Sequence, residues 1–347
     1  MRAASAAGAN SWAALAIIAA LSLQACAFRT AIDPALMSID RGTLPAPNFT
    51  ATIPGLGPCT DSADRSLHLN AAEPVTVLVH GCFGSTGQFR GLAQVLAFHG
   101  QQSACFTYDD RAALDVSARE LAASIDGLAG WLKPPPAAIP ITLIGHSQGA
   151  LVARRAVTTR QPQVIGGGAS KLRLLTVSGP FAGIAAADAC GSPVVRVMSL
   201  GLIAPMCRLG TGDKWADITY NSEFIRNPGA LSAQVDRHFK IDTDESGSCR
   251  RTVDGACVER DLTFTLEEQR NPAVDRDPAT EVIEVKAGHV EIVGDTRVAP
   301  VKLIALLQEK GIIRPTPPQK AAALNELLAD VYGDLSLLIS LTPLTRP

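Results

Sequence analysis

The sequence predicts an α/β protein with a doubly wound, mostly parallel sheet, an inserted helical cap and a C-terminal helical extension. Continuous β-branched and aliphatic runs of strand length recur along the chain, as in strands that are buried on both faces. Helical stretches alternate with these runs, which is typical of a parallel sheet covered by helices. One stretch rich in Ala, Val, Leu and Met interrupts the alternation, and this interruption predicts the cap.

The expected elements follow one another along an α/β domain at residues 57–310. Strands are expected at residues 75–79, 104–108, 141–144, 172–177, 237–241 and 281–285. Helices are expected at residues 88–98, 117–132, 148–158 and 298–308. The cap is placed at about residues 184–234. Apolar residues at helical spacing predict a further helix over 321–341, within a C-terminal extension at 311–347.

The N-terminus has the features of an export signal. Residues 1–25 contain Arg2 and an apolar run that is too short to span a bilayer, and residues 26–56 are expected to form a tether and edge strands. The end of the run resembles the bacterial lipobox, which implies a lipid on Cys26 and a cell-envelope protein, an outer-membrane lipoprotein facing the periplasm or the surface. The same residues also fit ordinary signal peptidase, so a periplasmic or secreted form stays an alternative.

Composition and cysteine count exclude several classes. The chain is 47% hydrophobic and 18% charged with a net charge of -2, which fits a globular protein and offers no basic cluster for nucleic acid. Eight cysteines leave seven if Cys26 is lipidated, so one is expected to stay a thiol. In an oxidising compartment the candidate disulfides are the pairs close in sequence, Cys190 with Cys207 and Cys249 with Cys257. No metal site and no cofactor is expected, because the cysteines lack CxxC spacing and neighbouring histidines.

The pentapeptide Gly145-His146-Ser147-Gln148-Gly149 carries the strongest chemical signal. It matches the nucleophile elbow G-x-S-x-G, a sharp strand-to-helix turn that exposes a serine. A predicted buried strand precedes it and an amphipathic helix follows it, as the elbow requires. Ser147 is therefore the candidate nucleophile.

With this elbow and with His80-Gly81 after a buried strand, the chain resembles the α/β-hydrolase superfamily, in particular its lipases and esterases. The resemblance covers about residues 74–308. It implies an oxyanion hole made by the backbone N–H groups of Gln148 and Cys82. His80 and His146 belong to the two motifs and are interpreted as structural.

The family order of serine, acid and histidine implies the other two members of a triad. His289, after the last predicted strand, is the expected base. The acid is expected after the strand at 237–241, where the candidates are Asp242, Asp244, Glu245, Asp254, Glu259 and Asp261. Asp254 is favoured, with Asp244 second, because Asp254-Gly255 resembles the Asp-Gly pair of lipases and Cys249 with Cys257 could staple its loop.

These residues imply hydrolysis of a carboxylic ester, a small-molecule or lipid ester, through an acyl-enzyme. A thioesterase or acyltransferase with the same triad is an alternative. A catalytically idle envelope protein that binds a ligand is another. The apolar cap favours an acyl chain as part of the substrate, and the membrane would be reached through the lipid on Cys26.

Overall fold

The computed structural model describes residues 43–333 apart from 134–138, 162–164, 169–170 and most of 188–211. The predicted signal peptide, the lipidation candidate Cys26, Cys190 and the end of the predicted C-terminal extension lie outside the described residues. Among the helices of the described part, none is both long enough and apolar enough to cross a membrane.

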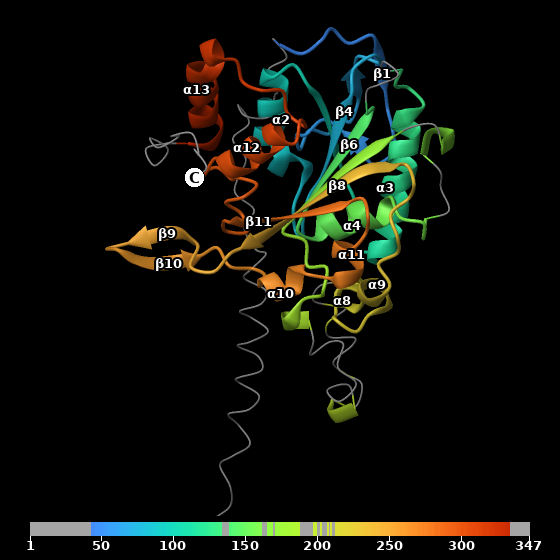
Figure 1. Cartoon of the computed structure of the whole chain (residues 1–347), viewed down its shortest axis with the longest axis vertical. Coiled ribbons are helices and arrows are strands. Elements are labelled where there is room, and N and C mark those ends of the chain that lie inside the picture. Colours follow the sequence, from blue (N-terminus) through green and yellow to red (C-terminus); the bar gives the residue numbers. More distant parts are fainter. Residues whose placement is uncertain are drawn as a thin grey trace, which may run out of the picture. The chain divides into compact units, whose positions relative to one another are not determined.

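A seven-stranded sheet with the order β11-β8-β7-β6-β4-β5-β2 forms the centre of the fold (Figure 1). Its strands are β2 (Leu56–Gly57), β4 (Val75–Val79), β5 (Gln102–Phe106), β6 (Ile141–His146), β7 (Leu172–Val177), β8 (Val235–Asp244) and β11 (Thr280–Lys286). All neighbouring strands are parallel except β2, which pairs antiparallel with β5 at one edge. The strand order reverses direction at β4, so the sheet is doubly wound. The predicted fold class is confirmed.

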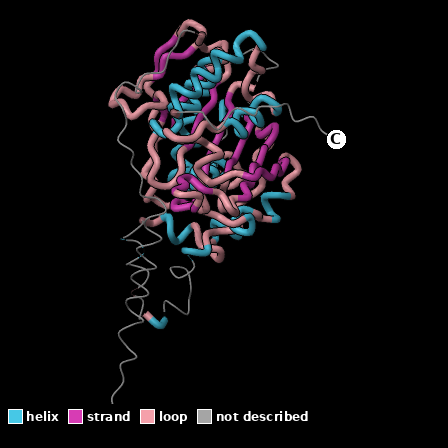
Figure 2. Tube along the Cα trace, turned by 90° about the vertical axis from the view of Figure 1, so that its left-hand side faces the viewer, coloured by secondary structure: helices cyan, strands magenta, loops and turns pink. Residues whose placement is uncertain are grey.

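Helices cover both faces of this sheet (Figures 1 and 2). They are α2 (Arg90–Phe98), α3 (Leu114–Ala129), α4 (Gln148–Ala156), α12 (Val301–Glu309) and α13 (Ala321–Tyr332). One core joins α3 and α4 to alternate residues of β4, Val75, Val77 and Val79. The other core joins α2, α12 and α13 to Leu78 of the same strand. Because side chains alternate across a strand, a continuous apolar run supplies both cores.

Most observed elements match the predicted ones to within a few residues. The helix predicted over 321–341 differs, because α13 ends at Tyr332 and is followed by Gly333 with a φ of 83°. The strands at 75–79 and 172–177 have the predicted bounds. Strand β5 begins and ends two residues earlier than predicted. It can begin at Gln102 because the polar side chain of this residue makes hydrogen bonds with the backbone of Asn70. Gln102 accepts a hydrogen bond from the Asn70 N–H at 2.5 Å and donates to the Asn70 carbonyl at 3.0 Å. A buried strand can therefore begin on a polar residue.

Two smaller sheets accompany the main one in the described part of the chain. Strands β1 (Phe49–Ala51) and β3 (Leu67–Leu69) pair antiparallel. Strands β9 (Cys249–Val253) and β10 (Ala256–Arg260) form a hairpin that projects from the body of the domain (Figure 1). We call this pair of strands the projecting hairpin. It carries the Cys249–Cys257 disulfide, one of the two pairs predicted from the sequence.

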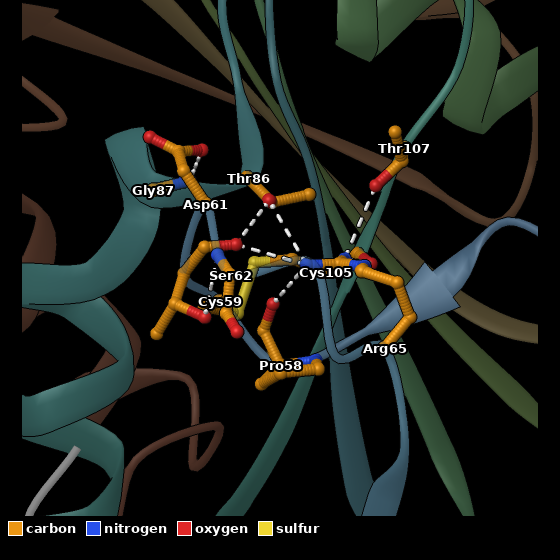
Figure 3. The surroundings of a disulfide bond; sticks show 10 residues. Pro58, Cys59, Asp61, Ser62, Arg65, Thr86, Gly87, Cys105 and Thr107 are labelled. Carbon is orange, nitrogen blue, oxygen red and sulfur yellow. Dashed lines mark hydrogen bonds between the residues drawn. A yellow bond between two sulfur atoms is a disulfide. The ribbon is translucent and has the colours of Figure 1, made fainter. Parts of the chain in front are cut away.

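A second disulfide joins Cys59 to Cys105 and was not predicted (Figure 3). The two cysteines are 46 residues apart in sequence, and both are fully buried. Cys105 lies opposite Gly57 in the β2–β5 pair, so the sheet brings Cys59 to it. Cys207 is also disulfide-bonded, while its expected partner Cys190 is not described. Cys82 carries a thiol.

The described part of the predicted cap contains only short helices. These are η4 (Ala185–Ala187), α8 (Lys214–Asp217) and α9 (Glu223–Arg226). We call residues 184–234 the inserted segment. The other short helices among the described residues are η2 (Thr86–Phe89), η3 (Ile165–Gly168), α10 (Leu266–Gln269), α11 (Pro272–Asp275) and η5 (Pro318–Lys320).

Candidate active site

Ser147 lies in a strained turn between β6 and α4. Its φ is 57° and its ψ is -126°, a left-handed conformation that non-glycine residues rarely adopt. A Cβ on Gly145 would lie 2.3 Å from the Gly149 carbonyl oxygen, and one on Gly149 would lie 2.3 Å from the Val79 carbonyl oxygen. Both glycines are therefore required by close backbone contacts, as the G-x-S-x-G motif predicts.

The surroundings of Ser147 combine a helix start with a tight loop. Helix α4 begins at Gln148, so the N–H groups of its first turn point away from the helix toward the serine. A Cβ on Gly81 would lie 2.9 Å from the Ser147 Cβ and 3.4 Å from its hydroxyl oxygen. The loop at residues 80–84 therefore lies directly against the serine, and we call it the oxyanion loop after the donor predicted at Cys82.

His289 follows β11 and is held beside the residue that precedes Ser147. Its backbone carbonyl accepts a hydrogen bond from Nε2 of His146 at 2.9 Å, and the two rings lie 4.6 Å apart. Burial lowers the pKa of His146 well below its usual value. His146 is therefore neutral and uses its one ring N–H to position the backbone of His289.

Glu245 is the carboxylate that contacts His289. Its Oε1 lies 2.9 Å from Nδ1 of His289, and its side chain is fully buried. The Thr243 hydroxyl donates to the same oxygen at 3.0 Å. The other oxygen, Oε2, accepts from the N–H groups of Thr263 at 2.5 Å and Phe264 at 2.8 Å. A buried carboxylate with this set of donors orients the imidazole and fixes its tautomer.

The structure does not bring the favoured acid, Asp254, to His289. Asp254 lies exposed in the turn of the projecting hairpin with a φ of 51°, followed by Gly255 with a φ of 77°. Positive φ at both central residues is what an Asp-Gly pair supplies in a two-residue hairpin turn. The prediction of Asp254 is corrected on this ground, because the Asp-Gly signal marks a turn.

The other carboxylate candidates have partners of their own. Asp244 accepts hydrogen bonds from the Ser246 hydroxyl at 2.6 Å and from Lys286 at 2.9 Å, and these bonds lower its pKa to about 2. Asp242 pairs with Lys240, and Glu259 pairs with Arg297. Glu245 was among the candidates but had no distinguishing sequence signal. Its place directly after β8 decides its role.

Asp261 holds the loop that carries His289. Its carboxylate accepts from the N–H groups of Val290 at 3.0 Å and Glu291 at 2.9 Å, and its carbonyl accepts from the His289 N–H at 3.1 Å. A Cβ on Gly288 would lie 2.1 Å from this carboxylate. Gly288 therefore allows the close approach, and this supporting function of Asp261 has no signal in the sequence.

The two predicted oxyanion donors belong to the two segments that adjoin Ser147. Gln148 is the first residue of α4, and Cys82 follows Gly81 in the oxyanion loop. The Tyr108 hydroxyl donates to the His80 carbonyl at 2.8 Å, which supports the start of the loop. Among the described residues, no group of three histidine, cysteine or acidic residues could hold a metal ion.

Comparison with protein-family models and with curated proteins finds no match. Solved structures similar to the chain include the mature lipase of Bacillus licheniformis, at 15% identity and a TM-score of 0.47, covering 76% of this chain and 98% of that one. Esterase 2 of Thermogutta terrifontis in its apo form has 13% identity and a TM-score of 0.46, covering 77% and 98%. Esterase B of Lactobacillus rhamnosis has 15% identity and a TM-score of 0.34, covering 68% and 74%.

Proposed function

We propose that this chain hydrolyses carboxylic esters through Ser147, His289 and Glu245. The observation that carries the proposal is the buried Glu245–His289 hydrogen bond, with His289 held by His146, the residue before a serine in a nucleophile elbow. A nucleophile, a base and a group that orients the base are the three parts of serine hydrolysis. Each part here comes from the end of a different strand of one parallel sheet, β6, β8 and β11.

In the first half-reaction, Nε2 of His289 takes the proton of the Ser147 hydroxyl as its oxygen attacks the ester carbonyl carbon. Glu245 accepts a hydrogen bond from the Nδ1–H of His289 and stabilises the imidazolium that forms. The tetrahedral intermediate then collapses, and His289 gives the proton to the leaving alcohol. An acyl-enzyme remains on Ser147.

In the second half-reaction, His289 takes a proton from water, and the hydroxide attacks the acyl-enzyme carbonyl. The negative oxygen of both intermediates is proposed to bind the backbone N–H groups of Gln148 and Cys82. Loss of one such donor typically costs about 100- to 1,000-fold in rate. Collapse of the second intermediate releases the carboxylic acid and returns the proton to Ser147.

We propose an apolar acyl chain as part of the substrate. Described side chains of the inserted segment support this, because Val197, Met198 and Leu209 are more than three-quarters exposed. Exposed apolar side chains that lie close in sequence are typical of segments that contact a ligand or a lipid surface. A lipid on Cys26 would hold the enzyme at such a surface. Mass spectrometry of the mature N-terminus tests the proposed lipid on Cys26, and an unmodified Cys26 would contradict that anchor.

A fluorophosphonate probe tests the proposed chemistry directly. The wild type is expected to be labelled at Ser147, and Ser147→Ala is expected to lose both labelling and ester turnover. Turnover of p-nitrophenyl esters from acetate to palmitate then gives the preferred chain length, with an acyl-CoA as the thioester comparison. A folded wild type that neither reacts with the probe nor cleaves any of these substrates would refute the proposal.

A further inference from the structure

Two backbone N–H groups of the oxyanion loop, those of Phe83 and Gly84, donate hydrogen bonds within the structure. The Gly84 N–H donates to the Gly81 carbonyl at 3.2 Å. The Phe83 N–H donates to the carboxylate of Asp110. The proposed oxyanion donor of this loop, Cys82, directly precedes Phe83, so the direction of the Cys82 N–H depends on what holds Phe83.

Phe83 needs an external partner to keep its conformation. Its φ is 52°, in the left-handed region, where a non-glycine residue is strained by roughly 1 kcal/mol or more. Such strain persists only where surrounding contacts stabilise it. Here the contact is the charge-assisted hydrogen bond to Asp110, which lies beyond the end of β5. Without it, we expect Phe83 to relax and to move Cys82 with it.

Asp110 contacts both sides of the proposed oxyanion hole. Its carboxylate binds the N–H of Phe83, next to Cys82. Its backbone carbonyl accepts a hydrogen bond from the side-chain amide of Gln148 at 3.0 Å. One residue thus connects the oxyanion loop to the start of α4. The relative position of the two proposed donors depends on it.

Lys214 of the inserted segment completes this cluster. Its ammonium group lies 3.3 Å from Oδ2 of Asp110 and 3.0 Å from the Cys82 sulfur, and 4.6 Å from the centre of the Phe83 ring. The side chain is only 2% exposed. Burying an ammonium group is costly unless it is paired, so Lys214 holds Asp110 and the oxyanion loop together.

The backbone of the inserted segment is anchored at the same place. The Asp213 N–H donates to the Arg111 carbonyl at 2.8 Å. A Cβ on Gly212, whose φ is 89°, would lie 2.2 Å from that carbonyl oxygen. The glycine therefore allows the segment to meet the chain next to Asp110, and Lys214 follows two residues later.

We infer that Asp110 and Lys214 are positioning residues that set the oxyanion hole, so that the inserted segment is required for turnover as well as for any substrate contact. This inference rests on the proposed ester hydrolysis. Asp110 and Lys214 touch the groups around the reacting atoms and take no part in proton transfer. Their loss lowers the rate by misdirecting the Cys82 N–H.

The test uses the full chain and compares Asp110→Ala, Asp110→Asn and Lys214→Met with the wild type. Asp110→Ala removes the acceptor and is expected to lower kcat about 10- to 100-fold, within the range for an oxyanion donor that is misplaced but not removed. Asp110→Asn keeps an acceptor oxygen for Phe83 and is expected to lose less. The matched control is Asp109→Asn, an exposed carboxylate in the same loop, which is expected to keep the wild-type rate.

A readout specific to the oxyanion hole separates positioning from a general loss of structure. The Ser147 hydroxyl is expected to add to the carbonyl of a trifluoromethyl ketone, and the negative oxygen of this hemiketal binds in the oxyanion hole. The inhibition constant of the ketone is therefore expected to rise in the Asp110 and Lys214 variants in proportion to their loss of kcat/KM. KM is expected to change about twofold or less, because the ester ground state carries little charge on its carbonyl oxygen. Circular dichroism confirms that each variant is folded.

The outcomes distinguish the two proposals. An active wild type with Asp110→Ala folded, fully active and unchanged in ketone inhibition would overturn the positioning inference and leave ester hydrolysis standing. If Asp110→Ala does not fold, wild-type ketone inhibition in both Asp110→Asn and Lys214→Met overturns it. A wild type without probe labelling or ester turnover overturns both proposals together.

Discussion

Replacement of Glu245 by glutamine is the sharpest test of the triad. The amide is close in shape to the carboxylate but has one acceptor where the carboxylate has two. Oε2 receives two backbone N–H groups, and Oε1 faces Nδ1 of His289 and the Thr243 hydroxyl. An amide nitrogen at the Oε2 position would oppose two backbone donors, each costing about 1–3 kcal/mol as an unsatisfied buried group.

The amide nitrogen is therefore expected to face His289. It would donate to Nδ1, which places the imidazole proton on Nε2, and Nε2 could then no longer accept the Ser147 proton. A wrong tautomer of this kind lowers kcat about 10,000-fold, or about 5.4 kcal/mol at about 1.36 kcal/mol per factor of ten. The Glu245→Gln variant should still fold, because His289 keeps a hydrogen bond to the side chain at position 245.

The assay is turnover of a p-nitrophenyl ester by Glu245→Gln beside Asp254→Asn. The second variant changes an exposed carboxylate in the turn of the projecting hairpin and is expected to keep the wild-type rate. Circular dichroism and thermal unfolding check the fold of both. A Glu245→Gln enzyme within tenfold of the wild type, or an Asp254→Asn enzyme that loses activity to the same extent, would refute the assignment of the acid.

Three further predictions concern stability. Gly149→Ala puts a Cβ 2.3 Å from a carbonyl oxygen of β4 and should lower both the melting temperature and the activity. Gly130→Ala should be tolerated, because the atom nearest to its new Cβ is 3.5 Å away, and equal melting temperatures of the two variants would contradict this. Removal of the Cys59–Cys105 disulfide should lower the free energy of unfolding in urea titrations by about 4 kcal/mol, and removal of the Cys249–Cys257 disulfide by about 2.5 kcal/mol. The first loss is larger because that disulfide closes the longer loop, so the reverse order would be inconsistent with the chain-entropy account. Burial holds the pKa of His238 well below its usual value, so only the unfolded chain binds a proton at this side chain as the pH falls below about 6.5. The free energy of unfolding of the wild type should therefore fall by about 1.36 kcal/mol per pH unit there, relative to that of His238→Gln. Urea unfolding at pH 7.5 and 5.5 measures this difference, and an equal fall in both proteins would count against the reasoning.

The sequence alone was sufficient for the features that depend on neighbouring residues. Runs rich in β-branched and aliphatic residues predicted the strands, because a strand buried on both faces has few polar positions. The elbow at Ser147 was readable because its two glycines are required by contacts within a short stretch and with the adjacent strand. His289 was expected after the last strand because of the family order that the resemblance implies, and the carboxyl ends of the parallel strands do lie at one edge of the sheet.

Tertiary structure alone decided which distant groups meet. Six candidate carboxylates lie between residues 242 and 261, and only the packing of β11 against β8 brings His289 to Glu245. The Cys59–Cys105 disulfide depends on the pairing of β2 with β5, across 46 residues of sequence. The contact of Lys214 with Asp110 joins segments more than 100 residues apart. Sequence patterns specify local conformation and burial, whereas such pairings arise from how the elements pack, and that information is spread over the whole chain.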